Sequence, residues 1–198
     1  MINYLAKKIT NYYIKKNSIQ EEEREAYEYC FDIMLSTLLN LLAIIIISVA
    51  TRLYIEGTVF CIVFMTLRGI GGGYHANTHF LCFMTIMIVF AIYVIMLKLL
   101  PVSVLFYISI VFLIFGFVVI TLLAPVDTET KPLTKVEYKK NRIKTLILLI
   151  LYTLIASILL IFKATKYYAF NIVFPLFAVS VLMSLGTIKN IKWKRNQR

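Results

Sequence analysis

Long apolar segments dominate this chain, and they restrict its fold more than any other feature of the sequence. Six apolar runs occur, at residues 31–50, 53–67, 80–99, 102–123, 144–163 and 168–188. A helix needs about 20 residues, at about 1.5 Å each, to cross the hydrocarbon layer of a bilayer. Five of the runs meet this length, whereas residues 53–67 form a shorter run that contains Glu56. The pattern predicts an all-α integral membrane protein with six transmembrane helices.

The composition agrees with this interpretation and excludes several classes of protein. Apolar residues make up 61% of the chain and charged residues 16%, against about 45–50% and about 25% in an average soluble domain. A soluble fold of this size cannot bury so much hydrocarbon, so a soluble enzyme and a disordered tail are excluded. The cysteines are Cys30, Cys61 and Cys82. Their spacing includes no CxxC motif and favours free thiols over a disulfide framework.

The distribution of basic residues predicts the topology. With six spans and both termini in the cytoplasm, 17 of the 21 Lys and Arg residues lie on the cytoplasmic side, in agreement with the positive-inside rule. A re-entrant segment at 53–67 is the alternative. It places the basic segment KPLTKVEYKKNRIK (131–144) outside the cell, so we prefer six spans.

The chain is expected to be a single polytopic membrane domain, residues 1–198. Residues 1–29 form an amphipathic N-terminal region whose helix lies at the membrane interface, since apolar residues recur there at helical spacing between lysine pairs. The six spans occupy residues 30–188, and residues 189–198 form a basic C-terminal tail. The net charge of +11 is concentrated at the ends of the apolar runs. This arrangement favours contact with anionic lipid head groups over nucleic-acid binding.

Chemically useful residues gather in one segment, RGIGGGYHANTHFLC, at residues 68–82. Four of the seven glycines, both histidines and Cys82 lie in it. Irregular backbone survives at membrane depth only when it is buried in protein or lines a wet cavity. A thiol beside an imidazole is suited to nucleophilic catalysis. The alternative interpretation is that the segment is only a glycine-rich turn that connects two spans.

Metal binding is the other chemistry that this segment permits. On one continuous helix His75, His79 and Cys82 share a face and are able to hold zinc, as in a non-enzymatic transporter or sensor subunit. No Asp or Glu occurs between Glu56 and Asp127, so no nearby carboxylate is available to act as a base or to orient an imidazole. We therefore expect no metal and no other cofactor.

Spacing alone does not decide which histidine serves Cys82. A seven-residue offset along a helix is about 10 Å, which is too far for proton transfer from His75. His79 is the helical neighbour and is slightly preferred by spacing. His75 reaches the thiol only if residues 71–79 are not helical and fold back, which the glycines permit.

The segment RGIGGGYHANTHFLC, the six-span layout, the length and the later APVDTETKPL resemble the accessory gene regulator B (AgrB) family over nearly the whole chain. That family consists of membrane cysteine endopeptidases that process quorum-sensing propeptides. The resemblance implies His75 as the catalytic histidine and Cys82 as the nucleophile, and thus a folded-back loop. It further implies supporting roles for Arg68, Gly72 and Gly73.

The resemblance also implies a partner and a product. The expected substrate is a short propeptide with an amphipathic N-terminal part and an acidic C-terminal tail. Cleavage on the C-terminal side proceeds through a thioester on Cys82, at the cytoplasmic face, and leads to a thiolactone or lactone ring. A homodimer in a bacterial cell membrane is expected. The resemblance does not identify a third group that orients His75; Asp127 and Glu129, the nearest acids by topology, are the candidates. A basic cytoplasmic loop that attracts the substrate comprises Lys135, Lys139, Lys140 and Arg142.

Overall fold

A computed structural model of the chain describes residues 2–74, 78–127 and 133–196. Within these ranges the secondary structure is helical apart from one isolated β-bridge. The principal helices are α1 (Ile2–Lys15), α2 (Arg24–Thr51), α3 (Tyr54–Gly71), α4 (His79–Leu99), α5 (Val102–Leu123), α6 (Lys135–Ile161) and α7 (Lys166–Asn196).

The six helices α2–α7 are long and apolar enough to cross a membrane, which confirms the prediction of six spans. The short run around Glu56 belongs to α3, a continuous helix of 18 residues that is about 27 Å long at about 1.5 Å per residue. This length is close to the hydrocarbon thickness of about 30 Å. The protein is therefore a multi-pass membrane protein in which α3 is long and apolar enough to form the second span.

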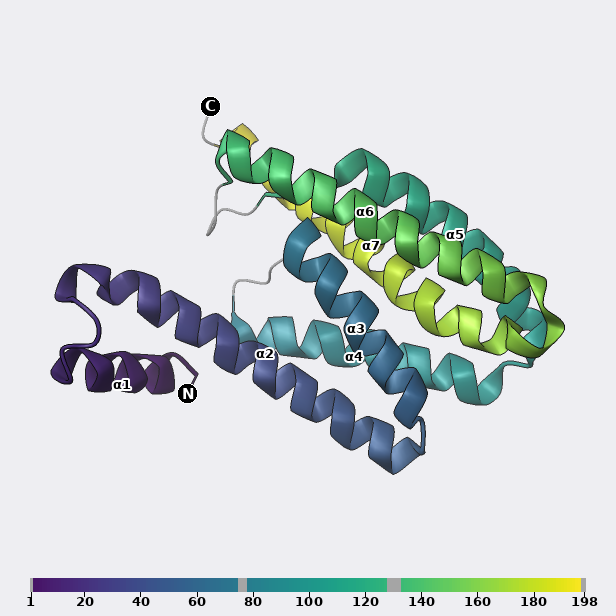
Figure 1. Cartoon of the computed structure of the whole chain (residues 1–198), viewed down its shortest axis with the longest axis horizontal. Coiled ribbons are helices and arrows are strands. Elements are labelled where there is room, and N and C mark those ends of the chain that lie inside the picture. Colours follow the sequence, from purple (N-terminus) through teal and green to yellow (C-terminus); the bar gives the residue numbers. More distant parts are fainter. Residues whose placement is uncertain (1, 75–77, 128–132, 197–198) are drawn as a thin grey trace.

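Helix α7 is the central element of the bundle. In its membrane-spanning part 78% of the residues are buried, against 17% in α2. It packs against α3, α5 and α6, and Figure 1 shows α5, α6 and α7 side by side. The core between α3, α4 and α7 is aromatic, with the Phe60 ring centroid 5.1 Å from Tyr93 and 6.5 Å from Phe174. Large rings therefore fill the space between these three helices.

The N-terminal segment forms the expected amphipathic helix, and α1 folds back along the beginning of α2 (Figure 1). Ala6 and Thr10 are buried, and the rings of Tyr13 and Phe31 stack with centroids 5.9 Å apart. The other face of α1 stays exposed through Tyr4 and other side chains. Its position at the membrane interface stays a prediction.

Two helices extend beyond the apolar runs. Helix α6 begins at Lys135, where the capping box of Thr134 and Glu137 starts it, and its basic first turns precede the apolar run. Helix α7 continues to Asn196, so most of the basic C-terminal segment is helical. We call the end of the bundle where α3 ends and α4 begins the glycine-loop end; α6 begins and α7 ends there as well.

Candidate active site at the glycine-loop end

Cys82 lies in the first turn of α4. Thr78, in extended conformation, is the N-cap, and its hydroxyl oxygen accepts a hydrogen bond from the Leu81 amide at 3.3 Å. The Cys82 amide donates to the Thr78 carbonyl oxygen at 3.1 Å, which closes the first helical turn. The half-buried thiol is thus held near a helix N-terminus, where unpaired amides and the helix dipole favour negative charge.

Arg68 connects this thiol to the loop that precedes α4. From the last turn of α3, its Nη2 donates to the Tyr74 carbonyl oxygen at 2.9 Å and lies 3.6 Å from Cys82 Sγ. The guanidinium lies 5.7 Å from the centroid of the Phe64 ring, and its Nη1 is buried without a hydrogen-bond partner among the described residues. One cation therefore holds both the candidate nucleophile and the residue just before His75.

The glycine loop, which we define as residues 71–74, is fixed through its backbone. Gly72 and Gly73 have φ values of 73° and 137°, in the region that favours glycine. The Val126 amide donates to the Gly71 carbonyl oxygen at 2.9 Å, and the Tyr74 amide donates to the Leu182 carbonyl oxygen at 2.8 Å. The loop thus lies between α7 and the segment that follows α5.

Helix α7 approaches this loop so closely that only a glycine fits at one position. A Cβ atom on Gly186 would lie 2.8 Å from the Gly73 carbonyl carbon and 2.8 Å from the Tyr74 nitrogen. One turn later, Lys189 Nζ lies 5.7 Å from the centroid of the Tyr74 ring. Neither Gly186 nor Lys189 is among the residues predicted from the sequence. The sequence does contain an indication of the role of Gly186, because an isolated glycine within an apolar helical run often has a packing reason.

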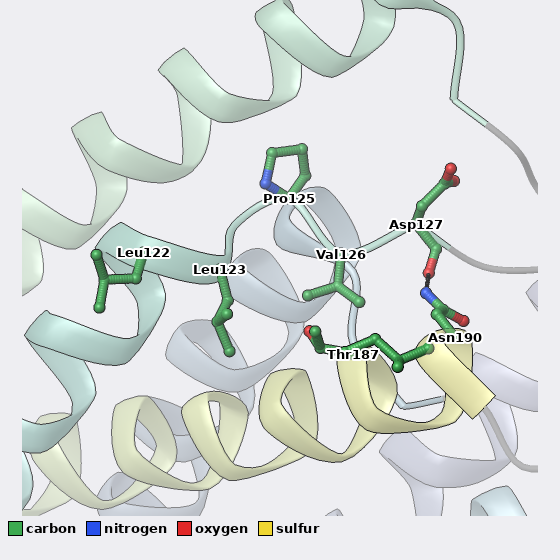
Figure 2. Close-up of a pocket in the computed structure, with 8 residues that line it drawn as sticks. Leu122, Leu123, Pro125, Val126, Asp127, Thr187 and Asn190 are labelled. Atoms are coloured by element: carbon green, nitrogen blue, oxygen red, sulfur yellow. Dashed lines mark hydrogen bonds between the residues drawn. The ribbon is translucent and has the colours of Figure 1, made fainter. Parts of the chain in front are cut away.

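The segment 124–127 completes this end of the bundle and borders a pocket of about 230 Å³ between the ends of α5 and α7 (Figure 2). Asp127 and Asn190 both line the pocket, and the Asn190 side-chain amide donates to the Asp127 carbonyl oxygen. The Asp127 carboxylate accepts from the Leu133 amide at 3.0 Å. Asp127 therefore organises its own segment, and Glu129 lies outside the described residues.

The structure describes some of the predicted site residues and leaves others outside the described ranges. Arg68, Gly72, Gly73 and Cys82 lie within the described structure, whereas His75 lies outside it and the side chain of His79 is not described. Because α4 begins at His79 and Thr78 is extended, residues 75–82 do not form one helix. The metal-binding alternative assumed that His75, His79 and Cys82 lie on one face of a continuous helix, and the extended Thr78 interrupts such a helix. Within the described residues no group of three potential metal ligands occurs.

The basic residues expected in a loop are instead helical. Lys135, Lys139, Lys140 and Arg142 lie in the first turns of α6, and the three lysines are exposed. Arg142 Nη1 donates to the Ala124 carbonyl oxygen at 3.3 Å, so this side chain holds the segment after α5. The expectation of a basic loop is corrected to a basic helical surface, which we define as Lys135, Lys139 and Lys140. Its helical form follows from the capping box at Thr134.

The chain is similar to known proteins over most of its length. Residues 6–188 match the family model described as accessory gene regulator B. Two putative AgrB-like proteins of Clostridium perfringens, from strains SM101 and 13, are 28% and 27% identical to this chain over 149 residues. Each alignment covers 73% of this chain and 69% of the relative. No solved structure matches the chain.

Proposed function

Because this chain belongs to the accessory gene regulator B family, whose members process autoinducing propeptides, we propose that it is a cysteine endopeptidase with Cys82 as nucleophile and His75 as base. The observation that carries the proposal is the position of Arg68. Its Nη2 lies 3.6 Å from Cys82 Sγ and donates to the carbonyl oxygen of Tyr74, the residue before His75. A single guanidinium thereby brings the thiol and the histidine-bearing loop together.

The first half of the reaction forms a thioester. His75 takes the proton from Cys82, because the thiolate is the effective nucleophile. The sulfur attacks the carbonyl carbon of the scissile peptide bond and forms a tetrahedral intermediate. Arg68 Nη1, which has no partner among the described residues, and amides of the glycine loop supply donors for the oxyanion. His75 then protonates the leaving amine, and the shortened peptide remains attached to Cys82.

The second half closes the ring. A thiol or hydroxyl within the bound peptide attacks the thioester carbonyl, and the proton that it loses passes through His75 to the departing Cys82 sulfur. The product is a thiolactone or a lactone, and the enzyme returns to its starting state. Water competes for the same thioester, so a site recessed at a membrane-embedded helix end favours cyclisation over hydrolysis.

The substrate approaches from the cytoplasm, where both termini of the enzyme lie. Its amphipathic part rests on the inner leaflet of the membrane, and its acidic tail is attracted to the basic helical surface of α6. The proposal includes a homodimer.

Mass spectrometry of the enzyme mixed with its propeptide tests the covalent step. A peptide linked to Cys82 accumulates when the ring-closing residue of the peptide is replaced. Cys82→Ala abolishes both adduct and cleavage. Cys30→Ala and Cys61→Ala are the matched controls and keep both, because Cys30 is exposed on α2 and Cys61 is buried within α3. Cleavage without any adduct on Cys82 contradicts the proposal.

The two histidines separate the peptidase from the metal-binding alternative. His75→Ala removes cleavage, whereas His79→Ala has a mild effect if the enzyme needs only the His75–Cys82 pair. A metal site that uses both imidazoles loses its ion in either variant. Equal loss of function in the two variants, together with bound metal in the purified wild-type protein, contradicts the peptidase mechanism.

A further inference from the structure

A second polar site lies at the end of the bundle opposite Cys82. It comprises Glu56 in the first turn of α3, Tyr93 in α4, and Tyr167 and Asn171 near the start of α7. The Tyr167 hydroxyl donates to Glu56 Oε1 at 3.2 Å. The Tyr93 hydroxyl lies 3.2 Å from the Glu56 carbonyl oxygen and 2.9 Å from Asn171 Oδ1. Three membrane-spanning helices thus place polar atoms at one point inside an aromatic core.

Hydrogen bonding within this cluster is incomplete. A phenol has one proton, so Tyr93 is unable to donate to both of its acceptors at once. A half-turn of the Asn171 carboxamide resolves the conflict, because its nitrogen then donates to Tyr93 and Tyr93 donates to Glu56. Either orientation leaves one amide atom of Asn171 without a partner among the described residues. The residue is 1% exposed, so no bulk water reaches that atom.

Charge is also unbalanced at this point. A carboxylate within a membrane-spanning helix is costly unless an opposite charge neutralises it. No ion pair joins Glu56 to a Lys or Arg among the side chains that the structure describes. Two lysines at this end of the bundle have other contacts: Lys98 Nζ donates to the Thr51 carbonyl oxygen at 2.9 Å, and Lys166 Nζ lies 3.7 Å from the centroid of the Phe106 ring.

We propose that Glu56, Tyr93, Tyr167 and Asn171 form a binding site for a small monovalent cation such as Na⁺. The donor set is the Glu56 carboxylate, the Asn171 carboxamide oxygen, the Glu56 backbone carbonyl oxygen and two phenol oxygens. Such all-oxygen sites suit hard cations rather than soft transition metals. One carboxylate matches one positive charge, whereas Ca²⁺ sites draw on more oxygen ligands and commonly on several carboxylates.

The position of the site gives the cation a structural role, which is to stabilise the packing of α3, α4 and α7. The three helices that it joins also carry Arg68, Cys82 and the α7 surface on which the glycine loop lies. A ligand that binds only the folded arrangement stabilises it by mass action. Cation binding therefore fastens α3, α4 and α7 at the end opposite the candidate active site.

Thermal unfolding of the purified full-length protein in lipid nanodiscs tests this inference without any activity measurement. NaCl replaces N-methylglucamine chloride at constant pH and ionic strength. We expect the melting midpoint to rise by about 4 °C or more as Na⁺ saturates the site. The same midpoint in both salts, or a midpoint that follows pH but not Na⁺, overturns the proposal. This comparison uses only the wild-type protein, so its outcome does not depend on whether a variant folds.

Variants locate the effect. Glu56→Gln keeps the size of the side chain but removes its charge, so the Na⁺-dependent rise disappears. Asn171→Leu removes the unpartnered amide and reduces the rise. Glu22→Gln is the matched control, because Glu22 is an exposed acid before α2, and it keeps the full rise. An equal rise in wild type and Glu56→Gln shows binding elsewhere and overturns the assignment.

Discussion

At the scale of single residues, two glycines in this chain have opposite surroundings. A Cβ on Gly186 meets the backbone of Gly73 and Tyr74 at 2.8 Å, whereas a Cβ on Gly69 has no atom within 4 Å apart from its chain neighbours and the nearby backbone of its own helix. The Gly186 contact is with backbone, which is unable to rotate aside as a flexible side chain does. The close approach of α7 to the glycine loop therefore depends on the absence of a side chain at position 186.

Gly186→Ala is expected to lower kcat for propeptide cleavage by about 100-fold, because the displaced loop moves His75 away from Cys82. The KM for the propeptide changes little, since the basic helical surface is untouched. Gly69→Ala, the matched control, retains wild-type kinetics. Steady-state kinetics in nanodiscs provide both parameters, and a Gly186→Ala enzyme with unchanged kcat contradicts the positioning role of α7.

Arg68 gives a second prediction at this scale. Arg68→Lys keeps the charge but loses the planar group whose Nη2 lies between Tyr74 and Cys82. We expect kcat to fall by about 100–1,000-fold, the range for loss of one donor to developing charge. The rate of Cys82 alkylation by iodoacetamide also falls. Arg52→Lys, at the C-cap of α2 and at the opposite end of the bundle, changes neither quantity. An Arg68→Lys enzyme with unchanged kcat contradicts the proposed role.

At the scale of elements, the apolar runs predict the six spans because a membrane demands about 20 apolar residues per crossing. They do not predict where a helix continues into water. Helix α6 starts nine residues before its apolar run begins at 144, since Thr134 and Glu137 cap a polar segment. The contacts of the glycine loop with Leu182 and Val126 join residues more than 50 positions apart, and no local pattern encodes them.

The basic helical surface of α6 carries the prediction at the element scale. Joint replacement of Lys135, Lys139 and Lys140 by Glu reverses the charge that faces the acidic tail of the propeptide. We expect KM to rise by about tenfold at low ionic strength, with kcat unchanged and with the difference shrinking as salt is added. Arg52→Glu, at the other end of the bundle, is the control. An unchanged KM contradicts substrate attraction by this surface.

For the whole molecule, the central position of α7 couples the two ends of the bundle. Its first turns contribute Tyr167 and Asn171 to the polar cluster, and its last turns contact the glycine loop and segment 124–127. The strong burial of its spanning part makes α7 the common support of both sites. Which end faces the cytoplasm decides whether the candidate active site meets newly made propeptide.

Labelling by a membrane-impermeant maleimide measures that orientation. In a background with alanine in place of the three native cysteines, Tyr54→Cys places an exposed thiol at the end opposite the glycine loop, and Lys139→Cys places one at the glycine-loop end. The positive-inside rule predicts labelling of the Tyr54→Cys variant in intact cells and of the Lys139→Cys variant only after permeabilisation. A re-entrant α3 instead exposes position 139 on the outer surface. Labelling of the Lys139→Cys variant in intact cells therefore contradicts both the six-span topology and a cytoplasmic site.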